Sequence, residues 1–262
     1  MTAIWDPQQY LKFSGPRLRP ALDLLAQIAA DDVRTVYDLG CGPGNLTNFF
    51  KDRWPEADII GVDASEEMLT RAREAHDDAH DPRVKWQQAD LTKWRPDVPA
   101  DVLYSNAALQ WVDGHETLFP GLVSSLDEGG VFAAQMPRNH KAPSHALMHD
   151  VIEASPWADT IRGARGLPPV MEPEEHYDLL RPHVSQLNIW ESEFLQVLEG
   201  DNAVAEWTKG SALKPYLDAL ETEDQRQVFF DDYADRLRDI YPKRPDGKTL
   251  FPFRRIFIVA TR

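Results

Sequence analysis

Three features of the sequence predict an α/β protein with a doubly wound, mostly parallel sheet and an inserted helical cap. Short apolar strand patterns alternate with helical patterns between residues 35 and 135. A glycine-rich loop directly follows the first of these strands. After Met136 the alternation stops, and the chain becomes rich in Pro and His before further helical patterns begin. Regular alternation of buried strands and helices is typical of a parallel sheet covered on both faces.

The alternating region contains five strand patterns and three helical patterns. We expect strands at 35–39, 58–62, 84–88, 100–105 and 131–135, and helices at 45–53, 65–74 and 115–126. Ser65 is suited to cap the second helix, although Met68 stands where a full capping box has Glu or Gln. Gly129 and Gly130 should separate the third helix from the fifth strand.

The rest of the chain adds two strands and a set of helices. We expect one helical stretch at about 144–154, a strand at 187–198, two or three helices within 201–240 and a final strand at 249–261. The sheet then has seven strands. We divide the chain into an N-terminal lid and first helix (1–33), a core (34–136), a helical cap (137–183 and 201–245) and closing strands (184–200 and 246–262).

Charge and cysteine content narrow the classes of partner. The chain carries 43 acidic and 28 Lys or Arg residues, a net charge of −15. A strongly acidic surface repels phosphate backbones and anionic lipids, so we expect neither a nucleic-acid nor a membrane partner. The single cysteine, Cys41, and the absence of a signal-peptide pattern favour a cytoplasmic location. The sequence does not predict the oligomeric state.

The glycine-rich loop is the strongest functional signal. Asp38, Gly40, Gly42 and Gly44 lie between the first strand and the first helix of the core. Glycines are needed where the backbone turns sharply and a ligand approaches closely. A carboxylate beside the loop would repel a pyrophosphate but suits a cationic sulfonium or α-ammonium group. An ordinary glycine-rich turn is the alternative. We interpret Cys41 within the loop as a small packing residue rather than a nucleophile.

Acidic and amide side chains follow the next three strands. Asp63 ends the second strand and is placed to accept both hydroxyls of a ribose, or else only to cap the strand. Asp90 follows the third strand and can accept from an adenine amino group, and Asn106 follows the fourth. The other cofactor-binding candidates are Ala64, Met68, Leu91, Ala107, Gln110, Trp111 and Tyr10. Trp5 and Tyr10 can close over the cofactor or staple the first helix.

These motifs resemble those of the class I methyltransferases, which have a Rossmann-like fold and use S-adenosyl-L-methionine. A closer resemblance is to the trans-aconitate 2-methyltransferase family. It rests on W-D-P-Q-Q-Y-L-K-F at 5–13, R-L-R-P at 17–20, N-A-A-L-Q-W at 106–111, W-T-K-G-S-A-L-K-P at 207–215 and R-I-F-I-V-A at 255–260. Phe253-Arg254-Arg255 departs from that pattern, because the family has proline before its C-terminal arginine, and this leaves open whether Arg254 or Arg255 faces the substrate.

The resemblance implies methyl transfer to one carboxylate of trans-aconitate or a similar small polycarboxylic acid, giving a monomethyl ester. A carboxylate is ionised at pH 7, so the reaction needs no general base. We therefore expect no catalytic acid or base, and alignment of the reacting groups should be enough. The alternative is methylation of a phenol, an amine or a carbon, which usually needs a base. A NAD-binding protein or a non-enzymatic cofactor-binding module is a further class.

A tricarboxylate needs several fixed cations, and arginine binds carboxylates with two parallel hydrogen bonds. The substrate-binding candidates are Arg17, Arg19, His145, Trp207, Lys209, Lys214 and Arg255. Each charged candidate can instead be a solvated surface residue. His145 and His149 have metal-ligand spacing, but no third ligand is evident and we expect no metal. Arg255 lies in an apolar strand, where either a substrate carboxylate or an acidic side chain must pair with it.

Overall fold

The computed structural model describes residues 14–76, 81–164, 166 and 168–262, with side chains from residue 18 onward. The chain forms two compact units, each built from separate segments. One unit comprises 1–18, 138–169 and 193–255, and the other comprises 19–137, 170–192 and 256–262. We call them the cap unit and the sheet unit.

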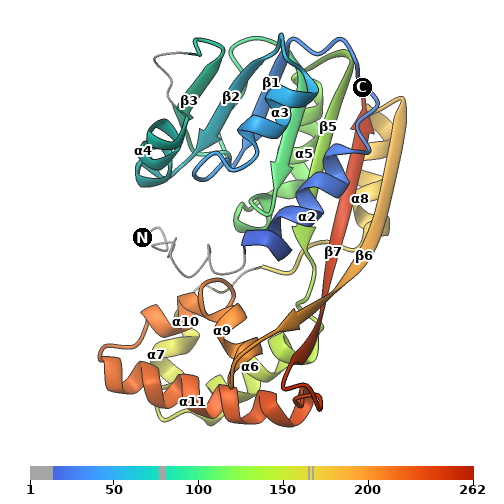
Figure 1. The fold of residues 1–262 in the computed structure, drawn as a ribbon. Coiled ribbons are helices and arrows are strands. Elements are labelled where there is room, and N and C mark those ends of the chain that lie inside the picture. The colour runs from blue at the N-terminus through green and yellow to red at the C-terminus, as the bar shows by residue number, and fades with distance from the viewer. Residues whose placement is uncertain (1–13, 77–80, 165, 167) are drawn as a thin grey trace. The chain divides into compact units, whose positions relative to one another are not determined.

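A seven-stranded sheet organises the fold (Figure 1). Its strands are β1 (Thr35–Leu39), β2 (Asp58–Asp63), β3 (Val84–Gln88), β4 (Ala100–Asn106), β5 (Leu126–Pro137), β6 (Gln186–Leu198) and β7 (Thr249–Thr261). Their order across the sheet is β3-β2-β1-β4-β5-β7-β6. Strands β1 to β5 pair in parallel. The seven-stranded, mostly parallel sheet predicted from the sequence is thus confirmed.

β7 runs antiparallel to β5. At one end of the pair, Gly129 donates to the carbonyl of Arg262 and Arg262 donates to the carbonyl of Gly130. At the other end, the amide of Arg138 donates to the carbonyl of Arg254. Residue numbers rise along one strand as they fall along the other, which makes the sheet mixed.

Helices accompany the strands of the sheet unit. They are α2 (Ser14–Leu25), α3 (Thr47–Arg53), α4 (Glu66–Ala75), α5 (His115–Ser124) and α8 (Pro173–Leu180), with 3-10 turns at Leu109–Trp111 and Arg181–His183. The hydroxyl of Ser65 accepts from the amide of Met68 at 3.3 Å, which confirms the cap expected for α4. Tyr37, Phe119 and Phe132 lie in the apolar core of this unit. Burying each large side chain contributes about 1.5–3 kcal/mol to folding.

The cap unit is mainly helical, with the adjoining parts of β6 and β7. Its helices are α6 (Pro143–Ala154), α7 (Ala158–Arg162), α9 (Ala203–Lys209), α10 (Lys214–Asp218) and α11 (Glu223–Ile240). α11 packs against α6, α9 and α10. Trp207, Tyr233 and Phe251 are fully buried at its centre. The division into lid, core, cap and closing strands made from the sequence stays a prediction about domain organisation.

Two expectations about the elements were wrong. The third core helix was expected to reach Leu126, with Gly129 and Gly130 separating it from a strand at 131–135. Instead α5 ends at Ser124 and β5 spans Leu126–Pro137, so both glycines lie inside the strand. The hydroxyls of Ser124 and Ser125 both donate to the carbonyl of Gly121, at 2.8 and 2.9 Å. Such bonds from side chains to the backbone compete with continuation of the helix. The segment 137–183 was expected to carry one helical stretch, but it also contains α7 and α8.

No helix among the described residues is both long and apolar enough to cross a membrane.

Candidate functional site

The glycine loop after β1 depends on glycine for steric reasons. Gly40, Gly42 and Gly44 have φ values of +75°, +55° and +75°, which L side chains rarely adopt. A Cβ at Gly40 would lie 2.1 Å from the Cβ of Ala108. At Gly44 it would lie 2.6 Å from the indole of Trp86, whereas at Gly42 nothing stands within 4 Å. The loop is therefore packed at both ends and open in the middle.

Asp63 connects the end of β2 to this loop. Its Oδ2 accepts from the amide of Gly42 and its Oδ1 from the amide of Ser65, both at 2.9 Å. Two backbone donors thus fix the carboxylate while leaving it further acceptor capacity. Ala64 beside it is exposed, and Met68 on the following helix is buried.

Asp38 is a buried carboxyl group at the end of β1. It is 3% exposed and forms no hydrogen bond through its side chain with any described residue. Loss of water and the negative charge of Asp63 together raise the pKa of Asp38 to about 8. A cation placed beside this group would favour its ionised form and lower its pKa.

The ends of β3 and β4 complete this edge of the sheet. Asp90 is exposed and accepts from the hydroxyl of Thr92 at 2.7 Å and from its amide at 2.9 Å, and these bonds lower the pKa of Asp90. Leu91 next to it is buried. The Oδ1 atom of Asn106 accepts from the side-chain amide of Gln135.

The segment after Asn106 has an unusual backbone. Ala107 is the one non-glycine residue with positive φ among those described, at +54°. Such strain is often found at ligand sites. The side-chain amide of Gln110 donates to the carbonyl of Ala107 at 2.7 Å, while its buried Oε1 has no hydrogen-bond partner among the described residues. Trp111 is 37% exposed.

The structure therefore brings the cofactor-binding candidates of β1 to β4 to one edge of the sheet. Parallel pairing places Leu39 beside Val62 and Asp63 beside Gln88, so the carboxyl ends of these strands meet there. In open α/β sheets, ligands bind at this edge. Tyr10 lies outside the described residues, so its predicted role stays a prediction.

Among the predicted cations whose side chains the structure describes, only Arg255 is buried. It is 4% exposed, and its guanidinium lies 5.0 Å from the ring centroid of Phe253. That ring in turn packs against Trp207 at 5.6 Å. Arg254 is exposed, with a guanidinium nitrogen 3.9 Å from the carboxylate of Glu193. Arg255 and Trp207 thus belong to one aromatic cluster.

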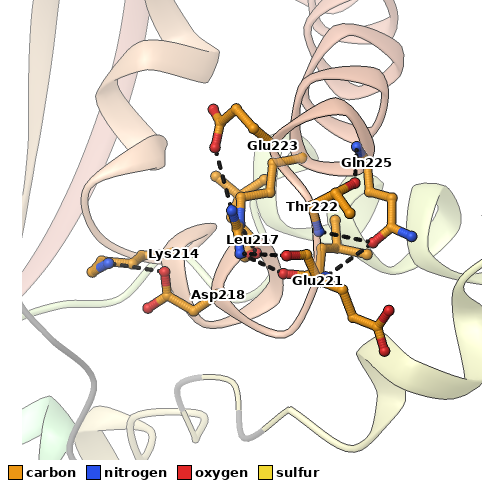
Figure 2. Close-up of polar contacts among 9 residues, drawn as sticks. Lys214, Leu217, Asp218, Glu221, Thr222, Glu223 and Gln225 are labelled. Atoms are coloured by element: carbon orange, nitrogen blue, oxygen red, sulfur yellow. Dashed lines mark hydrogen bonds and ion pairs between the residues drawn. The ribbon is translucent and has the colours of Figure 1, made fainter.

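The two lysines predicted to bind substrate, Lys209 and Lys214, lie on consecutive short helices, α9 and α10. The ammonium of Lys209 is 4.6 Å from the ring centroid of Phe230. Lys214 is bonded to Asp218 one turn along α10 at 3.0 Å, as Figure 2 shows. Arg226 fastens this helix to α11, because its guanidinium donates to the carbonyls of Leu217 at 3.1 Å and Leu220 at 2.6 Å.

His145 is a neutral imidazole at the start of α6. Burial, with the nearby imidazoles of His140 and His149, lowers the pKa of His145 to about 4. Its Nδ1 lies 3.1 Å from the hydroxyl of Ser144, and this bond orients the ring. Among the described residues no group of three or more His, Cys, Asp or Glu is arranged to hold a metal ion.

The N-terminal arginines give less information. Arg19 is largely exposed, and its guanidinium is 3.8 Å from the carboxylate of Asp23. The side chain of Arg17 lies outside the described part of the chain. Their predicted contacts with substrate stay predictions.

Sequence reasoning did not identify several residues that shape the edge of the sheet carrying the glycine loop, which we call the loop edge. The Nε2 of His76 donates to the carbonyl of Gly44 at 2.7 Å, and Trp86 packs against Gly44. Gln135 holds Asn106 from the neighbouring strand. These contacts join segments roughly thirty residues apart, 32 for the His76 bond and 29 for the Gln135 bond, and no local pattern signals them.

Comparison with known proteins gives consistent matches. Residues 36–130 match a family model described as a methyltransferase domain. The chain is 47% identical over 258 residues to a trans-aconitate 2-methyltransferase of Azoarcus sp. (strain BH72), covering 98% of this chain and 99% of that protein.

Two solved structures show a similar fold. The YcgJ protein of Bacillus subtilis has a TM-score of 0.61 at 16% identity, covering 92% of this chain and 96% of that one. Phosphoethanolamine N-methyltransferase 2 of Haemonchus contortus was solved with phosphomonomethylethanolamine and S-adenosylhomocysteine. It has a TM-score of 0.57 at 15% identity, and the match covers 92% of this chain and 52% of that one.

Proposed function

Because the chain belongs to the trans-aconitate 2-methyltransferase family, we propose that it transfers the methyl group of S-adenosyl-L-methionine to one carboxylate of trans-aconitate or a similar small polycarboxylic acid. The product is a monomethyl ester. The observation that carries this proposal is the 47% identity to the Azoarcus enzyme, which extends over the cap unit as well as the sheet unit.

The residues at the edge of the sheet fit S-adenosyl-L-methionine. Asp38 offers a buried acceptor with no hydrogen bond from the described residues, and Gln110 offers a buried carbonyl oxygen. Space beside Gly42 leaves the loop backbone accessible. When bound, the cofactor supplies an electrophilic methyl group on a positively charged sulfur.

Each acidic residue has a separate role in this proposal. Asp38 holds the cationic amino-acid end, because a buried carboxylate gains most from a cation. Asp63 accepts the ribose hydroxyls, having been oriented by the amides of Gly42 and Ser65. Asp90 accepts from the adenine amino group, and Leu91 provides apolar surface for the base.

The substrate's charge is balanced by the cap unit. The whole chain carries −15, so a tricarboxylate must be held by local cations. Arg255 is the proposed anchor, since its guanidinium keeps its charge when buried and its planar fork matches a carboxylate. Lys209, Lys214 and His145 are proposed to contact the remaining oxygens. No residue acts as a general base, because the attacking carboxylate is already ionised.

The direct test is methyl transfer from labelled S-adenosyl-L-methionine to a panel of tricarboxylates. We expect label in trans-aconitate, released as methanol by mild base because esters are base-labile. Label in a base-stable product, or only in a phenol or an amine, would refute carboxylate methylation. Copurification of a nicotinamide cofactor in place of an adenosyl sulfonium would refute the whole assignment.

We further propose a cytoplasmic location and no nucleic-acid partner. The acidic surface charge and the single cysteine support both.

A further inference from the structure

Asn139 forms a two-point bond with the backbone of β7. Its side-chain nitrogen donates to the carbonyl of Arg254, and its side-chain oxygen accepts from the amide of the same residue, both at 2.9 Å. The two residues are 115 positions apart in the chain. Asn139 is 5% exposed, so water competes little for these bonds.

This bond continues a strand ladder at the point where the backbone of β5 ends. β5 finishes at Pro137, and the amide of Arg138 makes the last backbone bond, to the carbonyl of Arg254 at 2.9 Å. The side-chain amide of Asn139 then acts as a further peptide group. Both the amide and the carbonyl of Arg254 are thereby satisfied within the cap unit.

The register at this position decides which arginine is enclosed. Side chains alternate between the two faces of a strand, so a slip by one residue would exchange neighbours. In the structure Arg254 is exposed and Arg255 is buried against Phe253. Asn139 holds the backbone of the residue directly before Arg255.

We propose that Asn139 is a positioning residue that sets Arg255, and not Arg254, as the enclosed cation for a substrate carboxylate. This inference rests on the proposed function, because it takes a small polycarboxylate as the ligand of Arg255. Asn139 itself does not touch the substrate. It acts through the backbone of β7, and its effect on substrate binding depends on an arginine at 255.

A double-mutant cycle tests this dependence. The dissociation constant of trans-aconitate is measured by calorimetry on enzyme saturated with S-adenosylhomocysteine, for Asn139→Ala, Arg255→Lys and the double variant. We expect Asn139→Ala to weaken binding about tenfold, and to have little further effect in the Arg255→Lys background. The affinity for S-adenosylhomocysteine should stay unchanged in all variants.

Two controls separate this effect from general destabilisation. Asn202→Ala removes another Asn contact within the cap unit, a bond from Arg238 at 2.6 Å, and should leave trans-aconitate binding intact. If Asn139→Ala does not fold, Asn139→Asp takes its place in the cycle, because it is isosteric and keeps the acceptor for the amide of Arg254.

The outcomes are distinguishable. Losses that multiply in the double variant, or wild-type binding by Asn139→Ala, would overturn the inference while leaving wild-type methylation of trans-aconitate in place. Wild-type enzyme that binds trans-aconitate but does not methylate it would refute the proposed function, and the cycle on binding would still decide the role of Asn139. Wild-type enzyme that does not bind trans-aconitate would overturn both.

Discussion

The loop edge of the sheet unit and the cation set of the cap unit prepare for a ligand in different ways. At the loop edge, backbone conformation comes first: three glycines with positive φ shape the loop, and an amide of that loop orients Asp63. In the cap unit, long side chains supply the charge, and Lys209 and Lys214 already contact protein groups. Where the backbone shapes a site, a single substitution should cause a large loss of ligand affinity. Where several side chains supply the charge, each substitution should cause only a partial loss.

The largest effect should follow from adding one carbon to the loop. Gly40→Ala places a Cβ 2.1 Å from the Cβ of Ala108 on a backbone with φ of +75°. Relief requires the loop to shift, and a displacement of about 1 Å can lower kcat/KM by about 100-fold. Steady-state kinetics and cofactor titration measure the loss. Gly129→Ala is the matched control, because it has φ of +80° but no neighbour within 4 Å, and it should lower stability without weakening cofactor binding. Equal cofactor affinities in the two variants would contradict the view that the backbone of the glycine loop shapes the cofactor site.

Asp63→Ala should give the next largest effect at the loop edge. The carboxylate both orients the loop through Gly42 and, in our proposal, accepts the ribose. Hydrogen bonds to a charged group contribute about 1.5–3 kcal/mol, so cofactor affinity should fall by roughly 10- to 150-fold. Asp58→Ala at the other end of β2 removes only an exposed pair with Lys85 and should bind the cofactor normally. Calorimetric titration that finds no loss in Asp63→Ala would reject the ribose assignment.

Arg255→Lys tests the cap unit with charge conserved. Lysine keeps the cation but loses the planar fork, so kcat/KM for trans-aconitate should fall about 10- to 100-fold while cofactor binding is unchanged. Arg254→Lys, at the exposed neighbour, should have a smaller effect. Wild-type kinetics in Arg255→Lys, or a variant that unfolds, would favour a purely structural role for the buried arginine.

The pH dependence of cofactor binding should distinguish Asp38 from the exposed acids. Burial raises the pKa of Asp38 to about 8, so at pH 7 the empty site holds a protonated carboxyl. A cation favours the ionised form, and affinity should rise with pH by up to about tenfold per unit until pH 8. Asp38→Asn should lose this dependence, and comparing the two proteins cancels titration of the ligand itself. Parallel pH profiles for both would show that Asp38 does not bind the cation.

The same shift has a consequence for stability, with the opposite sign to an ordinary carboxylate. Between about pH 4 and pH 8 the folded chain keeps a proton on Asp38 that the unfolded chain releases. Folding therefore becomes less favourable as pH rises through this window. Asp38→Asn should reduce that slope in thermal unfolding.

The smallest expected effect is none. We predict that treatment with a chelator leaves activity unchanged, because His145 and His149 belong to no group of three or more metal-ligand side chains among the described residues. Activity lost to a chelator and restored by a divalent ion would require another interpretation of these imidazoles.

The sequence predicted most of the fold because its signals are local. The strands at 35–39, 84–88 and 249–261 were predicted with the observed bounds from the residue pattern of each segment alone. α8 was missed although Glu172 and Glu175 form a capping box and Pro173 occupies its first turn. The richness of this segment in Pro and His obscured that start signal. α7 spans only Ala158–Arg162, too short for a periodic pattern.

The site was less accessible from the sequence than the fold. The strand-end acids were identifiable because topology brings the ends of parallel strands together. The bond from His76 to the loop and the bond from Asn139 to β7 depend on tertiary contacts between distant segments. The choice between Arg254 and Arg255 was also open in the sequence, since alternation alone does not say which face is covered.

The place of β7 in the sheet has a consequence for synthesis of the chain. It lies between β5 and β6, although both of these are made before it. It also supplies Phe251 and Phe253 to one apolar core and Ile256 and Ile258 to the other. Until residues 249–261 leave the ribosome, β6 has no strand to pair with, and both cores lack the apolar side chains that β7 contributes. Domains often fold one after another during translation, but here both units must wait for the same late segment.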